Sequence, residues 1–150
     1  MANTYTQLFV QIIFSTKNRE NVLRKEIRER LFKYISGIIS NKGHKPLAIN
    51  GHTNHVHIFV SLKPDISVSN LVKGIKQNST NFVKEKGLIK HKFNWQTGYG
   101  AFTYSRSQIN SVINYIKNQE KHHKTKTFEE EYTEFMKKFG VDYEERYLFD

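Results

Sequence analysis

The stretch "HTNHVHIFV" at residues 52–60 alternates polar and apolar side chains as a β-strand does. In such a strand Val56 and Ile58 point to one face of a sheet, while His55 and His57 point to the other. The two imidazoles then lie on one face with their Cβ atoms about 6–7 Å apart by strand geometry. This separation lets both rings converge on one metal ion, although a pair of half-exposed histidines that bind nothing also fits the pattern.

Hydrophobic periodicity outside this stretch predicts further strands and helices. The first six elements follow the order β-α-β-β-α-β, which predicts a ferredoxin-like antiparallel sheet with two helices on one face. We therefore expect an α+β fold with two extra C-terminal helices. Ser67, Ser107 and the pair Thr127 and Glu130 are the expected helix N-caps. The expected strands are 5–15, 45–51, 55–62 and 94–105, and the expected helices are 20–41, 67–87, 107–123 and 128–139.

Charge is unevenly distributed along the chain. The first 127 residues contain 21 of the 24 Lys and Arg residues but only 6 of the 14 Asp and Glu residues, while residues 128–150 contain 3 and 8. A body this basic attracts polyanions, and nucleic acid is the common one. Solubility alone would also explain an excess of lysine, so the charge favours a nucleic-acid partner without establishing one.

The composition excludes several classes of protein. The chain has 150 residues, enough for one domain, and no cysteine, so it offers neither disulfides nor thiolate metal ligands. Its first residues, "MANTYTQLFVQIIFS", lack the basic region and cleavage site of a signal peptide, and no apolar run is long enough to span a membrane. We expect a cytoplasmic protein with no membrane partner.

The predicted third helix carries a file of polar side chains beside its apolar stripe. In "SQINSVINYIKNQEKHHK" at residues 107–124, Tyr115 and Gln119 are four residues apart and share a face. In many amphipathic helices a tyrosine at this position simply packs against the edge of the hydrophobic core. Such packing does not explain why a whole polar file runs along the same side, formed by Gln108, Ser111, Tyr115, Gln119 and His122.

Taken together, these motifs resemble the single-tyrosine HUH transposases, the IS200-like enzymes of insertion sequences and their REP-associated relatives. The resemblance covers nearly the whole length of the chain. It is carried by "FSTKNR" at 14–19, "NHVHIFVSLKP" at 54–64, "WQTGYGAFTYS" at 95–105 and "YIKNQEKHH" at 115–123.

The resemblance implies a transposase that cleaves and rejoins single-stranded DNA with hairpin ends through a 5′-phosphotyrosine. Tyr115 would be the nucleophile, and His55, His57 and Gln119 would bind Mg²⁺ or Mn²⁺. It also implies a homodimer, in which the tyrosine helix can serve the histidine pair of its own subunit or that of the partner. Because the phosphotyrosine keeps the energy of the broken bond, no nucleotide cofactor is expected. Asn54 occupies a position that is often acidic in relatives, which leaves the outer partner of the histidines open.

Basic and aromatic side chains are candidates for holding the DNA. Four aromatic residues, Trp95, Tyr99, Phe102 and Tyr104, could stack on unpaired bases, although strand aromatics more often belong to a core. His52 and the pair His122–His123 are alternative metal ligands. The candidate phosphate contacts are Lys17, Arg19, Lys73, Lys76, Lys121, His122, His123 and Lys124, with a solvated surface as the alternative for each.

Residues 1–126 are expected to form the catalytic domain, and residues 127–150 an acidic amphipathic helix and tail of the same domain. Two other functions remain open. A domesticated relative would act on chromosomal repeat hairpins instead of insertion-element ends. A noncatalytic ferredoxin-like module would bind nucleic acid and carry only the remains of a site.

Overall fold

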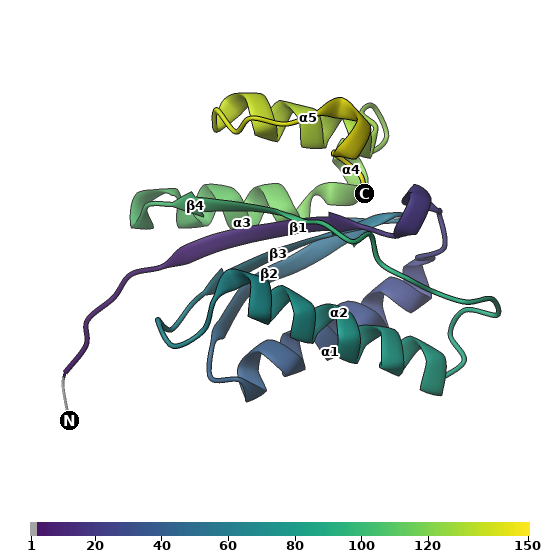
Figure 1. Ribbon diagram of the computed structural model, residues 1–150, viewed down its shortest axis with the longest axis horizontal. Coiled ribbons are helices and arrows are strands. Elements are labelled where there is room, and N and C mark those ends of the chain that lie inside the picture. Colours follow the sequence, from purple (N-terminus) through teal and green to yellow (C-terminus); the bar gives the residue numbers. More distant parts are fainter. Residues whose placement is uncertain (1–2) are drawn as a thin grey trace.

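A four-stranded antiparallel sheet divides the protein into layers (Figure 1). The computed structural model describes residues 3–150. The strands β1 (Phe9–Ser15), β2 (Lys45–His52), β3 (His55–Ser61) and β4 (Gly100–Tyr104) lie in the order β2-β3-β1-β4. Together with α1 (Lys25–Asn41) and α2 (Val68–Glu85), they confirm the expected ferredoxin-like α+β fold.

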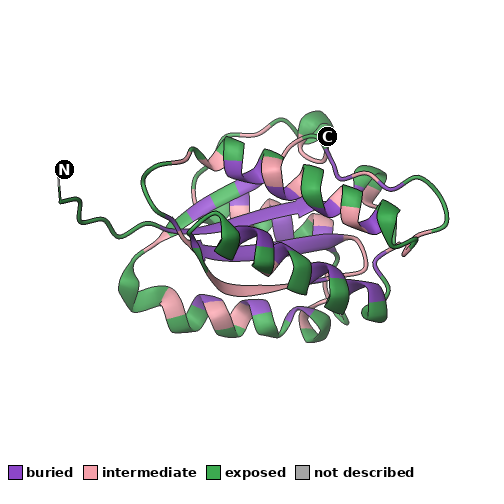
Figure 2. Ribbon diagram, turned by 90° about the horizontal axis from the view of Figure 1, so that it is seen from below, coloured by how far each residue is buried: buried purple, intermediate pink, exposed green. Residues whose placement is uncertain are grey.

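An apolar core fills the space between the sheet and the two long helices. Alternate residues of β1 and β3, such as Ile12 and Ile58, point toward α1 and α2 and are fully buried. Figure 2 shows the strands buried beneath helices that are exposed on their outer sides. Ser67 caps α2 as expected, because its side chain accepts a hydrogen bond from the amide of Asn70 at 3.1 Å.

The opposite face of the sheet is covered by α3 (Ile109–Lys117), α4 (Gln119–His122) and α5 (Phe128–Lys138), as Figure 1 shows. Phe128, Tyr132 and Met136 of α5 pack against sheet residues. Glycine at position 100 makes this packing possible, since a Cβ there would lie 2.7 Å from the Tyr132 hydroxyl oxygen. The face that the two core helices leave free is therefore closed by other helices.

Several predicted boundaries are wrong at their N-terminal ends. The first strand begins at Phe9 instead of residue 5, and the first helix begins at Lys25 instead of residue 20. The amide of Leu23 donates to the carbonyl of Thr53 at 2.9 Å, so this segment pairs with a loop instead of joining the helix. The fourth strand begins at Gly100, and residues 94–99 form a loop.

The single helix expected at 107–123 is divided. A short 3₁₀ turn, η2 (Arg106–Gln108), precedes α3, and Ser105 instead of Ser107 forms the capping box with Gln108. The helix breaks at Asn118, where φ is −97° and ψ is 20°. The side-chain amide of Asn118 donates to the Asn114 carbonyl at 2.9 Å, which takes up an acceptor at the end of the helix.

The remaining short elements connect these layers. A 3₁₀ turn, η1 (Lys17–Arg19), follows β1 and contains Asn18 with a φ of 58°. Another, η3 (Glu145–Tyr147), precedes the C-terminal residues, and the carbonyl of Asp150 accepts from the amide of Gly98 at 2.7 Å. Across residues 3–150 the structure contains no helix with both the length and the apolar character needed to cross a membrane.

Candidate active site

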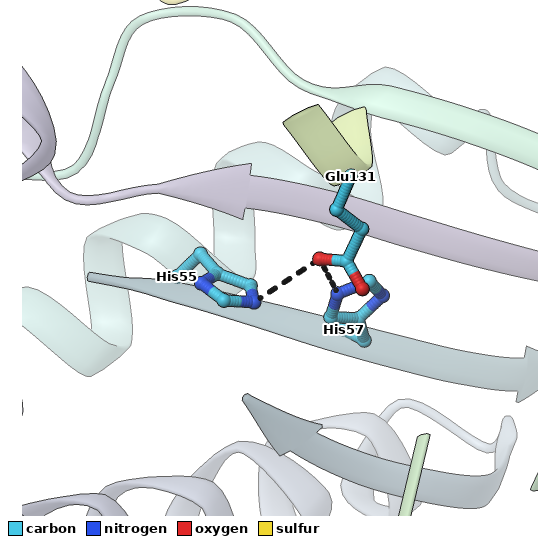
Figure 3. Close-up of side chains that lie close together, drawn as sticks. All are labelled: His55, His57 and Glu131. Atoms are coloured by element: carbon cyan, nitrogen blue, oxygen red, sulfur yellow. Dashed lines mark hydrogen bonds and ion pairs between the residues drawn. The ribbon is translucent and has the colours of Figure 1, made fainter. Parts of the chain in front are cut away.

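Two imidazoles and one carboxylate meet between β3 and α5 (Figure 3). Because His55 and His57 alternate with core residues along β3, both rings point to the face covered by α5. Their Nε2 atoms lie 3.4 and 3.0 Å from Oε1 of Glu131. Both histidines have no exposed surface, so the half-exposed pair that the sequence allowed is not what the structure shows.

The third helix brings the tyrosine and the glutamine to the same cluster. The Tyr115 hydroxyl donates to Oε2 of Glu131, and the Gln119 amide nitrogen donates to the same oxygen at 2.9 Å. Oε1 of Gln119 lies 2.8 Å from Nε2 of His55. The four residues expected at the site, His55, His57, Tyr115 and Gln119, therefore lie together within one chain.

Asn50 fixes the end of the tyrosine helix. It lies on β2 directly opposite His57 in the strand register. Its side-chain amide donates to the carbonyls of Ile116 and Lys117 at 3.0 and 3.1 Å. These carbonyls lie at the end of the helix, so Asn50 holds α3 on the sheet between Tyr115 and Gln119.

Each histidine has an outer partner on its second ring nitrogen. Nδ1 of His55 lies 2.9 Å from Oδ1 of Asn54, and Nδ1 of His57 lies 2.7 Å from Oε1 of Gln11. Both Nε2 atoms are thereby directed into the cluster. Asn54 makes this orienting contact through a neutral amide.

His123 closes the cluster from the loop between α4 and α5. Its Nε2 lies 3.1 Å from both Oε1 of Gln119 and Oε1 of Glu131, and its side chain is 4% exposed. Burial lowers the pKa of His123, but the hydrogen bond and charge of Glu131 outweigh burial and raise it overall. The sequence placed His123 among phosphate contacts or alternative ligands, and the structure places it against Glu131.

Burial and charge shift the protonation equilibria of the cluster. Burial would raise the pKa of Glu131, but the charges and hydrogen bonds of His57 and His123 outweigh it, so that pKa is lowered. Burial and then His57 lower the pKa of His55 well below its usual value. Burial, followed by the charge of Glu131, raises the pKa of Tyr115, so the phenol stays protonated in this arrangement.

The donor set suits a divalent cation. One potential ligand atom from each of His55, His57 and Glu131 lies within 4.8 Å of the others, and Gln119 adds an amide oxygen beside His55. Imidazole nitrogens with carboxylate and amide oxygens are ligands for Mn²⁺ and Mg²⁺ among other ions. The ligands predicted from the sequence included no carboxylate, and Glu131 is a candidate for that ligand.

The basic residues expected at the DNA are spread over the surface. Arg19 pairs with Glu129 at 3.5 Å, and His122 stacks on Tyr115 with ring centroids 4.6 Å apart. Lys76 is partly buried, and its ammonium donates to the carbonyls of residues 96–98 at 2.6–3.1 Å. The exposed members of the set are Lys17, Lys73, Lys121 and Lys124.

A hollow of about 500 Å³ lies beside the cluster. Its walls include His52 at the end of β2, Asn54 in the β2–β3 turn, and His123, Lys124 and Lys126 from the segment that precedes α5. Four of these five side chains can carry positive charge or donate hydrogen bonds from ring nitrogens. The hollow is thus a polar approach to the buried residues.

Most of the aromatic candidates belong to packed clusters. Trp95 and Phe102 are buried, and the Trp95 ring nitrogen donates to the Ser79 hydroxyl at 2.9 Å. Tyr104 is half-buried and contacts Phe59. Tyr99 is exposed, so of the four it is the one available to stack on a base.

Glu131, Gln11 and Asn50 are the site residues that the sequence reading missed. A signal for Glu131 exists, since it shares the inward face of α5 with Phe128 and Phe135, where an apolar residue is expected. Gln11 likewise interrupts the apolar strand "FVQIIFS". Asn50 gives no such signal, because polar residues are common on a partly exposed edge strand.

The chain is similar to transposases in both sequence and structure. A family model described as "Transposase IS200 like" matches residues 4–119. A protein from Deinococcus radiodurans R1 assigned as a transposase is 22% identical, has a TM-score of 0.65, and covers 79% of this chain and 95% of its own. A REP-associated tyrosine transposase bound to a REP hairpin is 17% identical, has a TM-score of 0.61, and covers 82% of this chain and 73% of its own. None of the curated proteins matches.

Proposed function

The chain belongs to the family of IS200-like transposases, and we propose that it cleaves and rejoins single-stranded DNA through a covalent link to Tyr115. The substrate class is a DNA strand with hairpin ends, such as the end of an insertion element. The similar REP-associated transposase is described as bound to a hairpin, which supports this partner. We propose that the enzyme acts in the cytoplasm, without a nucleotide cofactor.

One observation carries the proposal. The Tyr115 hydroxyl, the Nε2 atoms of His55 and His57, and the Gln119 amide all meet at Glu131. A nucleophile beside potential metal ligands is an arrangement suited to phosphodiester cleavage by a tyrosine. A noncatalytic binding module would have no use for this convergence inside a buried site.

The proposed reaction assigns metal binding and nucleophilic attack to different residues. His55, His57, Gln119 and Glu131 would hold Mg²⁺ or Mn²⁺, which would neutralise charge developing on the scissile phosphate. The Tyr115 oxygen attacks phosphorus and loses its proton, and the 3′ oxygen of the preceding nucleotide leaves with a proton as a free hydroxyl. The 5′-phosphotyrosine retains a phosphodiester bond, so a second 3′-hydroxyl can reverse the exchange and rejoin the DNA.

We propose that exposed basic residues hold the strand as it approaches. Lys124 lies on the wall of the polar hollow beside the cluster, and Lys121 is one turn earlier in the chain. Lys17, after β1, and Lys73, on α2 in the opposite layer, are exposed residues proposed to contact parts of the strand farther from the cluster. Such contacts to phosphate position DNA without reading its sequence.

We also propose a homodimer with a complete site in each subunit. The cluster is assembled within one chain, which supports cleavage by the tyrosine and histidines of the same subunit. β2 lies at the edge of the sheet and offers an unpaired strand edge for a partner. Residues 1–126 and the C-terminal segment 127–150 would then act as one domain.

The direct test is the search for a covalent protein–DNA adduct. Wild-type protein is incubated with labelled single-stranded DNA from its own locus and Mn²⁺ or Mg²⁺, then analysed on a denaturing gel. We expect an adduct that EDTA prevents, because the phosphate needs charge neutralisation. Tyr115→Phe should abolish the adduct, since it removes only the hydroxyl group.

Tyr34→Phe is the matched control, because Tyr34 is an exposed tyrosine on α1, in the layer opposite the cluster. It should leave the adduct unchanged. An adduct of full yield in Tyr115→Phe protein would overturn the assignment of the nucleophile. DNA binding without any adduct in wild-type protein would indicate the noncatalytic module instead.

A domesticated enzyme acting on chromosomal repeat hairpins is the second candidate, favoured by the structural similarity to the REP-associated transposase. The two candidates differ in substrate and share the chemistry. Parallel assays with hairpins from the flanking element ends and from chromosomal repeats separate them, because the preferred hairpin should be cleaved faster at equal concentration.

A further inference from the structure

A chain of polar contacts runs across three strands behind His57. Nδ1 of His57 on β3 lies 2.7 Å from Oε1 of Gln11 on β1. The Gln11 amide nitrogen donates to the Tyr104 hydroxyl on β4 at 2.8 Å. Gln11 is 1% exposed, although it stands in an otherwise apolar strand.

The strand register explains why these side chains meet. Gln11 lies opposite Phe59 and Phe102, while His57 lies opposite Ile13. Gln11 is therefore a diagonal neighbour of His57 on the same face of the sheet. Diagonal neighbours in a sheet are within reach of long side chains, and glutamine is long enough to bridge the two strands.

The contact at Nδ1 bears on which ring nitrogen can bind a metal ion. A neutral imidazole has one protonated nitrogen and one lone pair. An acceptor at Nδ1 keeps the proton there, so the lone pair of Nε2 would be available to a metal ion bound beside Glu131, whose Oε1 lies 3.0 Å from Nε2. The amide oxygen of Gln11 is such an acceptor. The amide nitrogen of Gln11 donates to the Tyr104 hydroxyl, and this contact anchors the amide with its oxygen toward His57.

We infer that Gln11 is a positioning residue that commits Nε2 of His57 to the divalent metal, and that Tyr104 holds the Gln11 amide in the required orientation. The inference rests on the metal site of the proposed function and deepens it. Gln11 contributes no charge, so it acts by orientation alone. Asn54 makes the corresponding contact with Nδ1 of His55 at 2.9 Å, at the rim of the site.

The test measures metal affinity directly by titration calorimetry of the full chain with Mn²⁺. Gln11→Met keeps the length of the side chain but removes the acceptor, and we expect a loss of affinity of about 10–100-fold, as for other outer partners of metal-bound histidine. Gln11→Glu retains an acceptor at Nδ1 and should keep the affinity within about threefold of wild type. A role in packing alone would predict the opposite ranking, because a buried carboxylate disturbs a core more than methionine does.

Tyr104→Phe provides a second variant in case Gln11→Met does not fold. It leaves the Gln11 amide without its anchor, and we expect a smaller loss of affinity, about three- to tenfold. Thermal melts and DNA binding in EDTA establish that each variant is folded.

Two results would overturn the inference. Wild-type affinity in folded Gln11→Met, or in folded Tyr104→Phe when Gln11→Met does not fold, would remove the positioning role and leave the proposed function intact. A wild-type protein that binds no Mn²⁺ would overturn the inference together with the metal-dependent part of the proposed function, while the Tyr115 adduct would still be tested separately.

Discussion

The two faces of β3 are built from the same seven residues but by different kinds of interaction. On one face, Val56 and Ile58 pack into the apolar core under α1 and α2. On the other face, His55 and His57 take part in directional contacts with Glu131, Gln119, Asn54 and Gln11. Both sets of side chains are fully buried, so burial alone does not distinguish them.

The two faces differ in how strongly their interactions depend on the identity and position of each neighbouring side chain. Apolar packing is nondirectional and tolerates substitutions that conserve volume. The polar cluster requires every buried donor and acceptor to be paired, and in residues 3–150 no buried side-chain nitrogen or oxygen lacks a partner. One face therefore supplies stability and the other specifies geometry.

The largest expected effect on cleavage comes from comparing substitutions at two neighbouring residues of β3 that point to opposite faces. His57→Ala should reduce cleavage by more than about 100-fold, since losing a ligand exceeds the loss caused by removing an outer partner. Ile58→Ala should lower the free energy of unfolding by about 2–5 kcal/mol through the cavity it leaves, with little change in cleavage per folded molecule. Adduct formation and urea denaturation, measured on both variants, check the contrast. A folded His57→Ala protein with wild-type cleavage would contradict it.

A smaller effect is expected from Glu131→Gln, which preserves shape but removes the charge. Because a neutral amide is a weaker ligand than a carboxylate, we expect Mn²⁺ affinity to fall about tenfold, or about 1.4 kcal/mol. Titration calorimetry measures the change. The matched control is Glu130→Gln, since the neighbouring Glu130 lies in an exposed capping box that glutamine also satisfies.

The same substitution can reveal another role for Glu131. If cleavage rises while Mn²⁺ affinity stays at the wild-type value, Glu131 is not a ligand. Its contact with the Tyr115 hydroxyl would then hold the nucleophile away from DNA. In that case Glu131 would restrain Tyr115 and would not bind the metal ion.

The smallest effect is expected at the surface beside the cluster. Lys124→Ala should weaken DNA binding a few-fold and reduce the slope of log affinity against log salt by about 1, because one phosphate contact is lost. Lys33→Ala, an exposed substitution on α1 in the opposite layer, is the control and should leave the slope unchanged. Binding measured at several salt concentrations distinguishes them. Equal slopes for both variants would exclude a contact between Lys124 and DNA.

The local pattern of the sequence was sufficient for most of the architecture. Alternation in "HVHIFVS" set the two faces of β3, and helical spacing with Ser67 as cap set α2. These features depend on neighbours within a few residues, so periodicity and capping can predict them. The predicted boundaries were wrong where a backbone amide bonds to a residue distant in the sequence. The amide of Leu23, for example, donates to the carbonyl of Thr53 instead of lying within the first helix.

The sequence by itself determined the ferredoxin-like order of strands and helices and the positive charge of residues 1–127. It also placed His55 and His57 on one face of a strand, and Tyr115 and Gln119 on one face of a helix. Only the tertiary structure decided that α5 covers the face of the histidines and brings Glu131 to them. It also decided that Gln11 and Asn50 support the site from neighbouring strands. The physical reason is that these contacts join residues 46 to 76 positions apart, and hydrogen bonds over such separations leave no local periodic trace in the chain.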